Sequence, residues 1–121
     1  MPNKKILLCD DDEGILDMLE ILLEDSGYEI YAERNSLNVH KIIAEYQPDL
    51  LVLDLWMPVL SGDQLVRSIR KNPALQDLPV IIISASRDGQ EIAANAGANE
   101  FLAKPFDISE LLENINKYLL N

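Results

Sequence analysis

The chain has 121 residues, which is enough for one domain with one hydrophobic core. Its formal net charge of -11 repels phosphate backbones, so direct nucleic-acid binding by this domain is not expected. No apolar run reaches the roughly 18 residues that span a bilayer, and the N-terminus lacks a signal peptide; we therefore expect one cytoplasmic domain over residues 1–121, with no membrane partner.

The first part of the chain alternates short apolar runs with stretches of helical periodicity. The elements that it predicts, in chain order, are strand 5–9, helix 14–25, strand 28–32, helix 36–46 and strand 50–54. Gly27 suits the C-terminal stop of the first helix. Pro48 ends the second helix, because the residue before a proline disfavours helical geometry.

The second part repeats the alternation. It predicts a helix from Ser61 to Asn72-Pro73, strand 79–83, helix 87–95, strand 100–103 and a final helix that opens at Asp107. Gln64 completes a capping box with Ser61. Three basic side chains suit the negative end of the same helix dipole, namely Arg67, Arg70 and Lys71. The helix over 87–95 is short and rich in glycine and alanine, so it is the weakest of the five.

Five strand–helix pairs predict an α/β fold, because consecutive parallel strands need right-handed crossovers through a helix. Short strands that are apolar throughout fit a sheet buried on both faces. We therefore expect a doubly wound, five-stranded parallel sheet with helices on both faces. Periodicity alone leaves the order of the strands open.

Chemically active side chains stand where four of the predicted strands end. Asp10 and Asp11 follow the first strand, Asp54 ends the third, Ser84 follows the fourth and Lys104 follows the fifth. In an open α/β sheet, ligands bind outside the carboxyl ends of the strands. The sequence therefore predicts one crevice with three carboxylates, a hydroxyl and an ammonium, a set that suits a divalent cation and a phosphoryl group on an aspartate.

These motifs give the chain a family resemblance over nearly its whole length. It resembles the receiver domain of two-component response regulators through Asp10-Asp11, Asp54 with Met57-Pro58 and Gly62, Ser84-Ala85, and Lys104-Pro105-Phe106. Each motif is weak alone, but four in order at strand ends make a strong signal. The resemblance implies a flavodoxin-like sheet with strand order 2-1-3-4-5.

The resemblance also implies the chemistry of the site. Asp54 would accept a phosphoryl group from a sensor histidine kinase or a phosphotransfer protein, with Mg²⁺ as cofactor. The implied metal ligands are Asp11 and Asp54 directly, Asp10 through a water, and the main-chain carbonyl of Trp56. Like charges about 5 Å apart repel by roughly 3 kcal/mol at an effective dielectric near 20, and Mg²⁺ with Lys104 would cancel the three carboxylate charges.

The expected response involves Ser84 and Phe101. By resemblance, Ser84 would donate to a phosphoryl oxygen and Phe101 would move inward, which would change the surface of helix four, strand five and helix five. That surface would bind a downstream effector or output domain, or form a homodimer. The chain would be a signalling domain and no enzyme beyond its own phosphoryl transfer and autodephosphorylation. Whether it stands alone or belongs to a longer regulator stays open.

Other residues have plainer interpretations. Asp12 and Glu13 suit the first turn of a helix, Cys9 suits a small buried filler, and His40 suits a solvated helix surface. Trp56 either anchors its loop or covers the phosphoryl group and slows hydrolysis. These two interpretations of Trp56 are balanced.

Three other classes of protein are alternatives for a chain of this kind. A flavodoxin-like nucleotide binder needs a Gly/Ser/Thr-rich loop after the first strand, where this chain has the acidic run 10–13. A haloacid-dehalogenase-like phosphatase needs a second aspartate two residues after the nucleophile, where this chain has Trp56. A receiver-like domain that only binds partners is the more serious rival, and it predicts no phosphoryl transfer.

Overall fold

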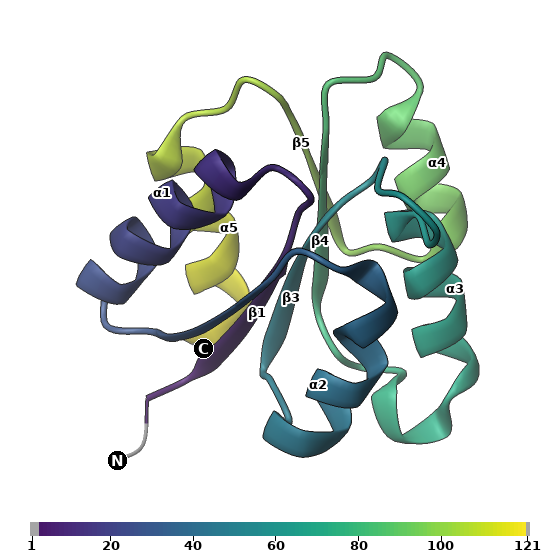
Figure 1. The fold of residues 1–121 in the computed structure, drawn as a ribbon, viewed down its shortest axis with the longest axis horizontal. Helices are drawn as coiled ribbons and strands as arrows, with labels where there is room; N and C mark the ends of the chain where they lie inside the picture. The colour runs from purple at the N-terminus through teal and green to yellow at the C-terminus, as the bar shows by residue number, and fades with distance from the viewer. Residues whose placement is uncertain (1–2, 121) are drawn as a thin grey trace.

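The computed structural model describes residues 3–120 and contains one five-stranded sheet between two layers of helices (Figure 1). All four strand pairs are parallel, and the order is β2-β1-β3-β4-β5. The strands are β1 (Lys5–Cys9), β2 (Glu29–Glu33), β3 (Leu50–Asp54), β4 (Val80–Ser84) and β5 (Glu100–Ala103). The predicted fold class and strand order are therefore confirmed.

The helices lie on both faces of the sheet (Figure 1). One face is covered by α1 (Glu13–Asp25) and α5 (Ile108–Leu119), and the other by α2 (Val39–Tyr46), α3 (Gly62–Lys71) and α4 (Gly89–Ala96). Two apolar clusters fill the spaces between sheet and helices, one on each side. Every residue of β3 and β4 is buried, which explains why these strands are apolar runs without alternation. Among the described residues, no helix combines the length and apolarity needed to cross a membrane.

Most predicted boundaries agree with the structure within a residue. The strands predicted at 28–32 and 79–83 each start one residue later. The helix predicted over 36–46 opens instead with a 3-10 turn, η1 (Ser36–Asn38), because the Asn35 side chain accepts the Leu37 N–H at 3.0 Å. The helix predicted over 87–95 begins only at Gly89, because a backbone turn from Gly89 to Ser86 precedes it.

The first helix begins and ends as the sequence predicts. Asp12 is its N-cap, and its carboxylate accepts the N–H groups of Gly14 and Ile15 at 2.9 and 3.3 Å. After the helix, Gly27 adopts a positive φ of 94°, which glycine tolerates without steric cost. Because the cap follows β1 directly, the chain passes from strand to helix at the edge where the acidic residues lie.

Candidate functional site

The sheet register brings the predicted site residues to one edge. Asp54 pairs with Ile83 across β3 and β4, and Ser84 pairs with Ala103 across β4 and β5. Asp10 follows Cys9, which pairs with Leu53. Neighbouring strands therefore end at the same level, and the polar side chains beyond them surround a common space.

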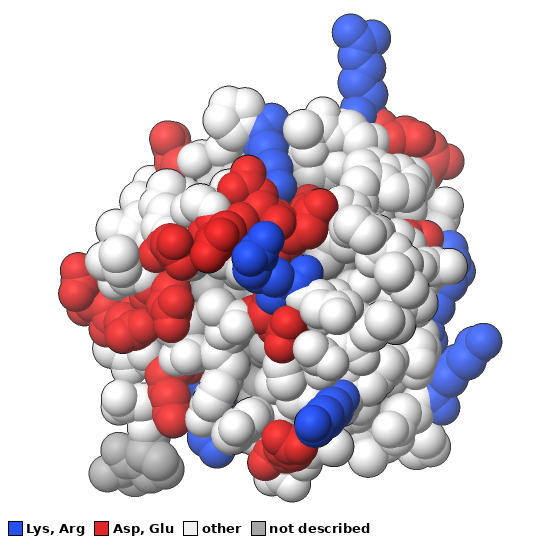
Figure 2. Space-filling view, viewed as in Figure 1, with Lys and Arg blue, Asp and Glu red and all other residues white. Residues whose placement is uncertain are grey.

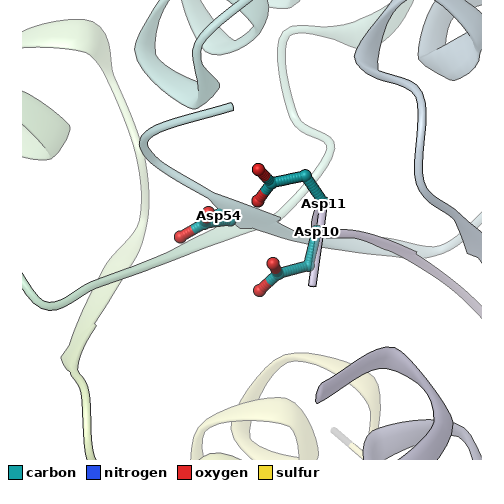
Figure 3. Close-up of side chains that lie close together, drawn as sticks. All are labelled: Asp10, Asp11 and Asp54. Carbon is teal, nitrogen blue, oxygen red and sulfur yellow. The ribbon is translucent and has the colours of Figure 1, made fainter. Parts of the chain in front are cut away.

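Three carboxylates form the centre of this space (Figure 3). Asp10, Asp11 and Asp54 each offer an oxygen, and these oxygens all lie within 4.8 Å of one another. Asp10 and Asp54 are buried, and Asp11 is exposed. Asp10 is also fixed by its backbone surroundings, since its Oδ1 accepts the Asp12 N–H at 2.9 Å. The predicted acidic cluster is thus assembled, with one carboxylate open to solvent.

Lys104 joins the cluster from β5. Its Nζ lies 3.1 Å from Asp10 Oδ2 and 3.2 Å from Asp54 Oδ1. Burial lowers the pKa of Lys104, but the hydrogen bond and charge of Asp10 outweigh burial, so its pKa is raised overall. The side chain therefore stays an ammonium between two buried carboxylates, as the sequence predicts.

Ionisation of the Asp54 carboxyl group remains unfavourable in spite of Lys104. Burial, and then the charge of Asp10, raise the pKa of Asp54 to about 6, although Lys104 lowers it. The Lys104 ammonium therefore does not offset the combined effect of burial and of Asp10 on Asp54. A further positive charge at this position would favour the ionised form of Asp54.

Ser84 and Phe101 lie on the β4–β5 side of the site. Ser84 is buried, and its Oγ accepts the Ser86 N–H at 3.0 Å, which leaves the hydroxyl proton available to donate. The Lys104 N–H donates to the Ser84 carbonyl at 2.9 Å. Phe101 is half-buried and packs against the apolar cluster that α4 shares. Both predicted switch residues are therefore adjacent to α4.

Trp56 does not anchor its loop, because 52% of the residue is exposed. The neighbouring Leu55 and Met57 are buried instead, and Cys9 Sγ lies 3.5 Å from Met57 Sδ. Gly62 lets the loop return closely, since a Cβ there would lie 2.5 Å from the Asp54 carbonyl oxygen. The buried side chains of Leu55 and Met57 thus anchor the loop, while the Trp56 indole remains on the surface.

Ser36 connects the start of η1 to the loop after β3, a role that the sequence did not predict. Ser36 Oγ donates to the Pro58 carbonyl at 2.9 Å, and the Leu60 N–H donates to Ser36 Oγ at 3.2 Å. Val59, between these partners, has a φ of 74°, which is uncommon for a β-branched residue. A serine near a helix start is ordinarily a local cap, so only the tertiary structure shows this link.

Arg70 also has an unpredicted role. Its guanidinium donates to the carbonyls of Leu78 and Gly97 at 2.8 and 3.0 Å, and to Asn99 Oδ1 at 2.8 Å. It donates as well to the carbonyls of Leu75 and Gln76, at the end of η2 (Pro73–Leu75). The side chain therefore binds the turn after α3 to the C-terminal end of α4, beyond any effect on its own helix dipole.

The remaining side chains match their plainer interpretations. His40 is exposed on α2. Cys9 is buried, and burial with the nearby carboxylates raises the pKa of its thiol to about 12, so the thiol is neutral and unreactive. Acidic side chains gather along α1 and at the neighbouring strand ends (Figure 2). On this face of the molecule, the acidic surface along α1 thus continues to the candidate site.

The fold and the edge cluster together define a doubly wound α/β domain of the receiver type. The family model for the response regulator receiver domain matches residues 6–116. The chain therefore belongs to the response regulator receiver domain family, and the expected resemblance is confirmed. This membership makes it a signalling domain.

Relatives and solved structures agree with the family. The chain is 32% identical over 121 residues to the phosphate regulon transcriptional regulatory protein PhoB of Pseudomonas aeruginosa, matching 98% of this chain and 53% of that protein. It is 28% identical to the polar-differentiation response regulator DivK of Brucella anthropi, over 96% of each chain. A putative response regulator from Chloroflexus aurantiacus superposes with a TM-score of 0.93 at 29% identity, over 99% of this chain and 100% of that one. The chain thus spans about half of PhoB and nearly all of DivK.

Proposed function

We propose that Asp54 is the phosphoacceptor of this domain, and that a sensor histidine kinase or a phosphotransfer protein is the donor. The observation that carries the proposal is a buried carboxylate at a strand end whose Oδ1 lies 3.2 Å from a lysine ammonium. Two further carboxylates, Asp10 and Asp11, offer oxygens beside it. Family membership supports phosphorylation-based signalling in general.

The proposed reaction is an in-line displacement at phosphorus. An oxygen of Asp54 forms a bond to phosphorus, the phosphorus–nitrogen bond of the donor phosphohistidine breaks, and its electron pair stays on the imidazole nitrogen. Lys104 would pair with the transferred phosphoryl group as a fixed point charge. The Ser84 hydroxyl would donate to a phosphoryl oxygen, because its proton is available.

The residues fit a bound Mg²⁺. The cluster offers only oxygen atoms, which are hard ligands of the kind this ion prefers, and Asp11 is exposed enough for an ion that keeps waters. Asp11 and Asp54 would bind it directly, Asp10 through a water, and the Trp56 carbonyl would complete the protein's share. When bound, the ion would supply positive charge beside Asp54, whose pKa is raised by burial and by Asp10, and would so favour the ionised carboxylate.

The proposed output is a change in the face formed by α4, β5 and α5. Ser84 and Phe101 connect the site to this face, and a local charge event can bias an element that has two arrangements. A downstream effector, an output domain or a second copy would bind there. The relatives named as transcriptional regulators are about twice as long, which supports an output domain as one possible partner.

Intact-mass measurement after incubation with acetyl phosphate and Mg²⁺ tests the proposal. We expect a mass gain of one phosphoryl group in the natural chain, no gain in Asp54→Asn, and no gain when EDTA replaces Mg²⁺. Asp17→Asn, at an exposed position on α1, is the matched control and should label normally. Equal labelling of the natural chain and Asp54→Asn would refute the assignment.

A further inference from the structure

Gly89, the first residue of α4, lies in contact with two residues of the site. A Cβ built on Gly89 would lie 2.8 Å from Phe101 Cε1, 3.0 Å from Phe101 Cζ and 3.1 Å from Ser84 Cβ. Real Cβ atoms essentially never approach other heavy atoms closer than 3.0 Å. No side chain therefore fits at this position while the ring stays where it is.

Backbone geometry does not explain this glycine. Gly27 and Gly97 have positive φ angles, but Gly89 has helical geometry that any L-residue adopts. Glycine is also a poor helix former, and alanine would favour the helix. Space, and not conformation, is therefore what excludes a side chain at position 89.

The same end of α4 has few other restraints. Its N-cap, Asp88, makes no side-chain cap hydrogen bond, because its carboxylate accepts the Ser86 hydroxyl instead. The opposite end is bound by Arg70 through the Gly97 carbonyl. The contact between Gly89 and the Phe101 ring thus helps to position the N-terminal turn of α4, together with the hydrogen bond from the Gly89 N–H to the Ser86 carbonyl.

The ring also has a place to move. Phe101 lines a hollow of about 190 Å³ between α4 and β5, whose other walls include Ala93, Ala94 and Ala98. These small side chains leave room beside the ring, so a methyl group at position 89 can displace it outward without breaking the sheet.

We infer that Gly89 is a positioning residue that sets the resting state of the switch. Its missing side chain lets the Phe101 ring lie against α4 beside Ser84, and this contact holds the α4–β5 surface in its unphosphorylated arrangement. A methyl group at position 89 changes that surface without phosphorylation. The signalling consequence rests on the proposed function, whereas the contact itself does not.

Thermal unfolding of a double-mutant cycle tests the contact. Gly89→Ala should lower the Tm of the natural chain by about 5 °C through overpacking. In a Phe101→Ala background the same substitution should raise the Tm by about 2 °C, because the gain in helix propensity then opposes only the milder approach to Ser84 Cβ at 3.1 Å. A Phe101→Leu background serves if the alanine variant does not fold. Gly89→Ala effects of the same sign and size in both backgrounds would overturn the inference.

Nuclear magnetic resonance of the unphosphorylated variants tests the switch. Gly89→Ala should shift the amide signals of α4 and β5 away from their positions in the natural chain, and in a direction other than the shift that beryllofluoride with Mg²⁺ produces, because the methyl group moves the ring outward and the proposed response moves it inward. Gly14→Ala is the matched control, because a Cβ there would meet only the Asp12 side chain, at 3.3 Å, and α4 should not respond. Signals of α4 and β5 that stay unchanged in Gly89→Ala would overturn the inference.

Labelling by acetyl phosphate separates this inference from the proposed function. If Gly89→Ala is labelled at Asp54 while its α4 signals match those of the natural chain, the inference fails and the function stands. If the natural chain is not labelled, the proposed function fails, and the thermal cycle still decides whether the Gly89–Phe101 contact exists.

Discussion

Replacing Asp54 with asparagine should stabilise the metal-free protein at neutral pH. The pKa of Asp54 is raised from 3.8 to about 6, mainly by burial and then by Asp10. A shift of roughly two pKa units corresponds to about 3 kcal/mol. Because the folded-state pKa is above the unfolded value, the native state holds the proton more tightly, and ionisation of this group costs stability above about pH 6.

The stability that the protein loses through ionised Asp54 depends on pH. The cost from Asp54 is absent below about pH 4, where the group is protonated in both states, and it is complete above about pH 6. From this group, the natural chain should gain stability as the pH falls from 7.5 to 4.5. Asp54→Asn lacks the titrating group, so it should be more stable by up to about 3 kcal/mol at pH 7.5 and nearly equal at pH 4.

Urea denaturation followed by far-ultraviolet circular dichroism, in EDTA, measures this difference. Asp17→Asn controls for the loss of one negative charge from an acidic chain, and it should change stability little at either pH. An Asp54→Asn variant that is less stable than the natural chain at pH 7.5, or whose advantage persists unchanged at pH 4, would show that the carboxylate cluster is not strained.

Two further outcomes follow from the site. Millimolar Mg²⁺ should raise the Tm of the natural chain, because the ion binds the folded site and not the unfolded chain. The Asp11→Ala variant should lose most of this rise in Tm. If Mg²⁺ leaves the Tm of the natural chain unchanged, the proposed metal site is contradicted. Trp56→Asn should speed loss of the phosphoryl group about tenfold, or roughly 1.4 kcal/mol of barrier, because the exposed indole would no longer exclude water. Val59→Asn, an exposed position on the same loop, is its control, and an unchanged rate in Trp56→Asn would show that the indole does not shield the site.

Much of this fold is predictable because its sequence signals are local. The buried strands β3 and β4 are apolar except for the last residue of each, which is polar. Once the strands are taken as parallel, Asp54 and Ser84 must share an edge of the sheet. The cluster with Lys104 then follows from topology and needs no knowledge of side-chain positions.

Most of the side-chain roles that the sequence did not predict depend on contacts between distant segments. Ser36 and Arg70 have side chains that suit local helix roles, yet they bind Pro58 and Gly97 across the fold. Gly89 resembles any glycine in a weak helix until the Phe101 ring is seen against it. The orientation of Trp56 depends on which neighbour fills the loop interior, and Met57 does so. Such choices are made by packing, which periodicity does not encode.

The hydrogen bonds of Arg70 restrain the C-terminal end of α4 more than its N-terminal end. The guanidinium holds the Gly97 carbonyl and Asn99 beside it, whereas the opposite end rests on an aromatic ring. If the proposed switch displaces α4, we expect the movement to be largest near Asp88 and smallest near Gly97. Under that proposal, a partner that binds the first turn of α4 would distinguish the phosphorylated domain better than one that binds its last turn.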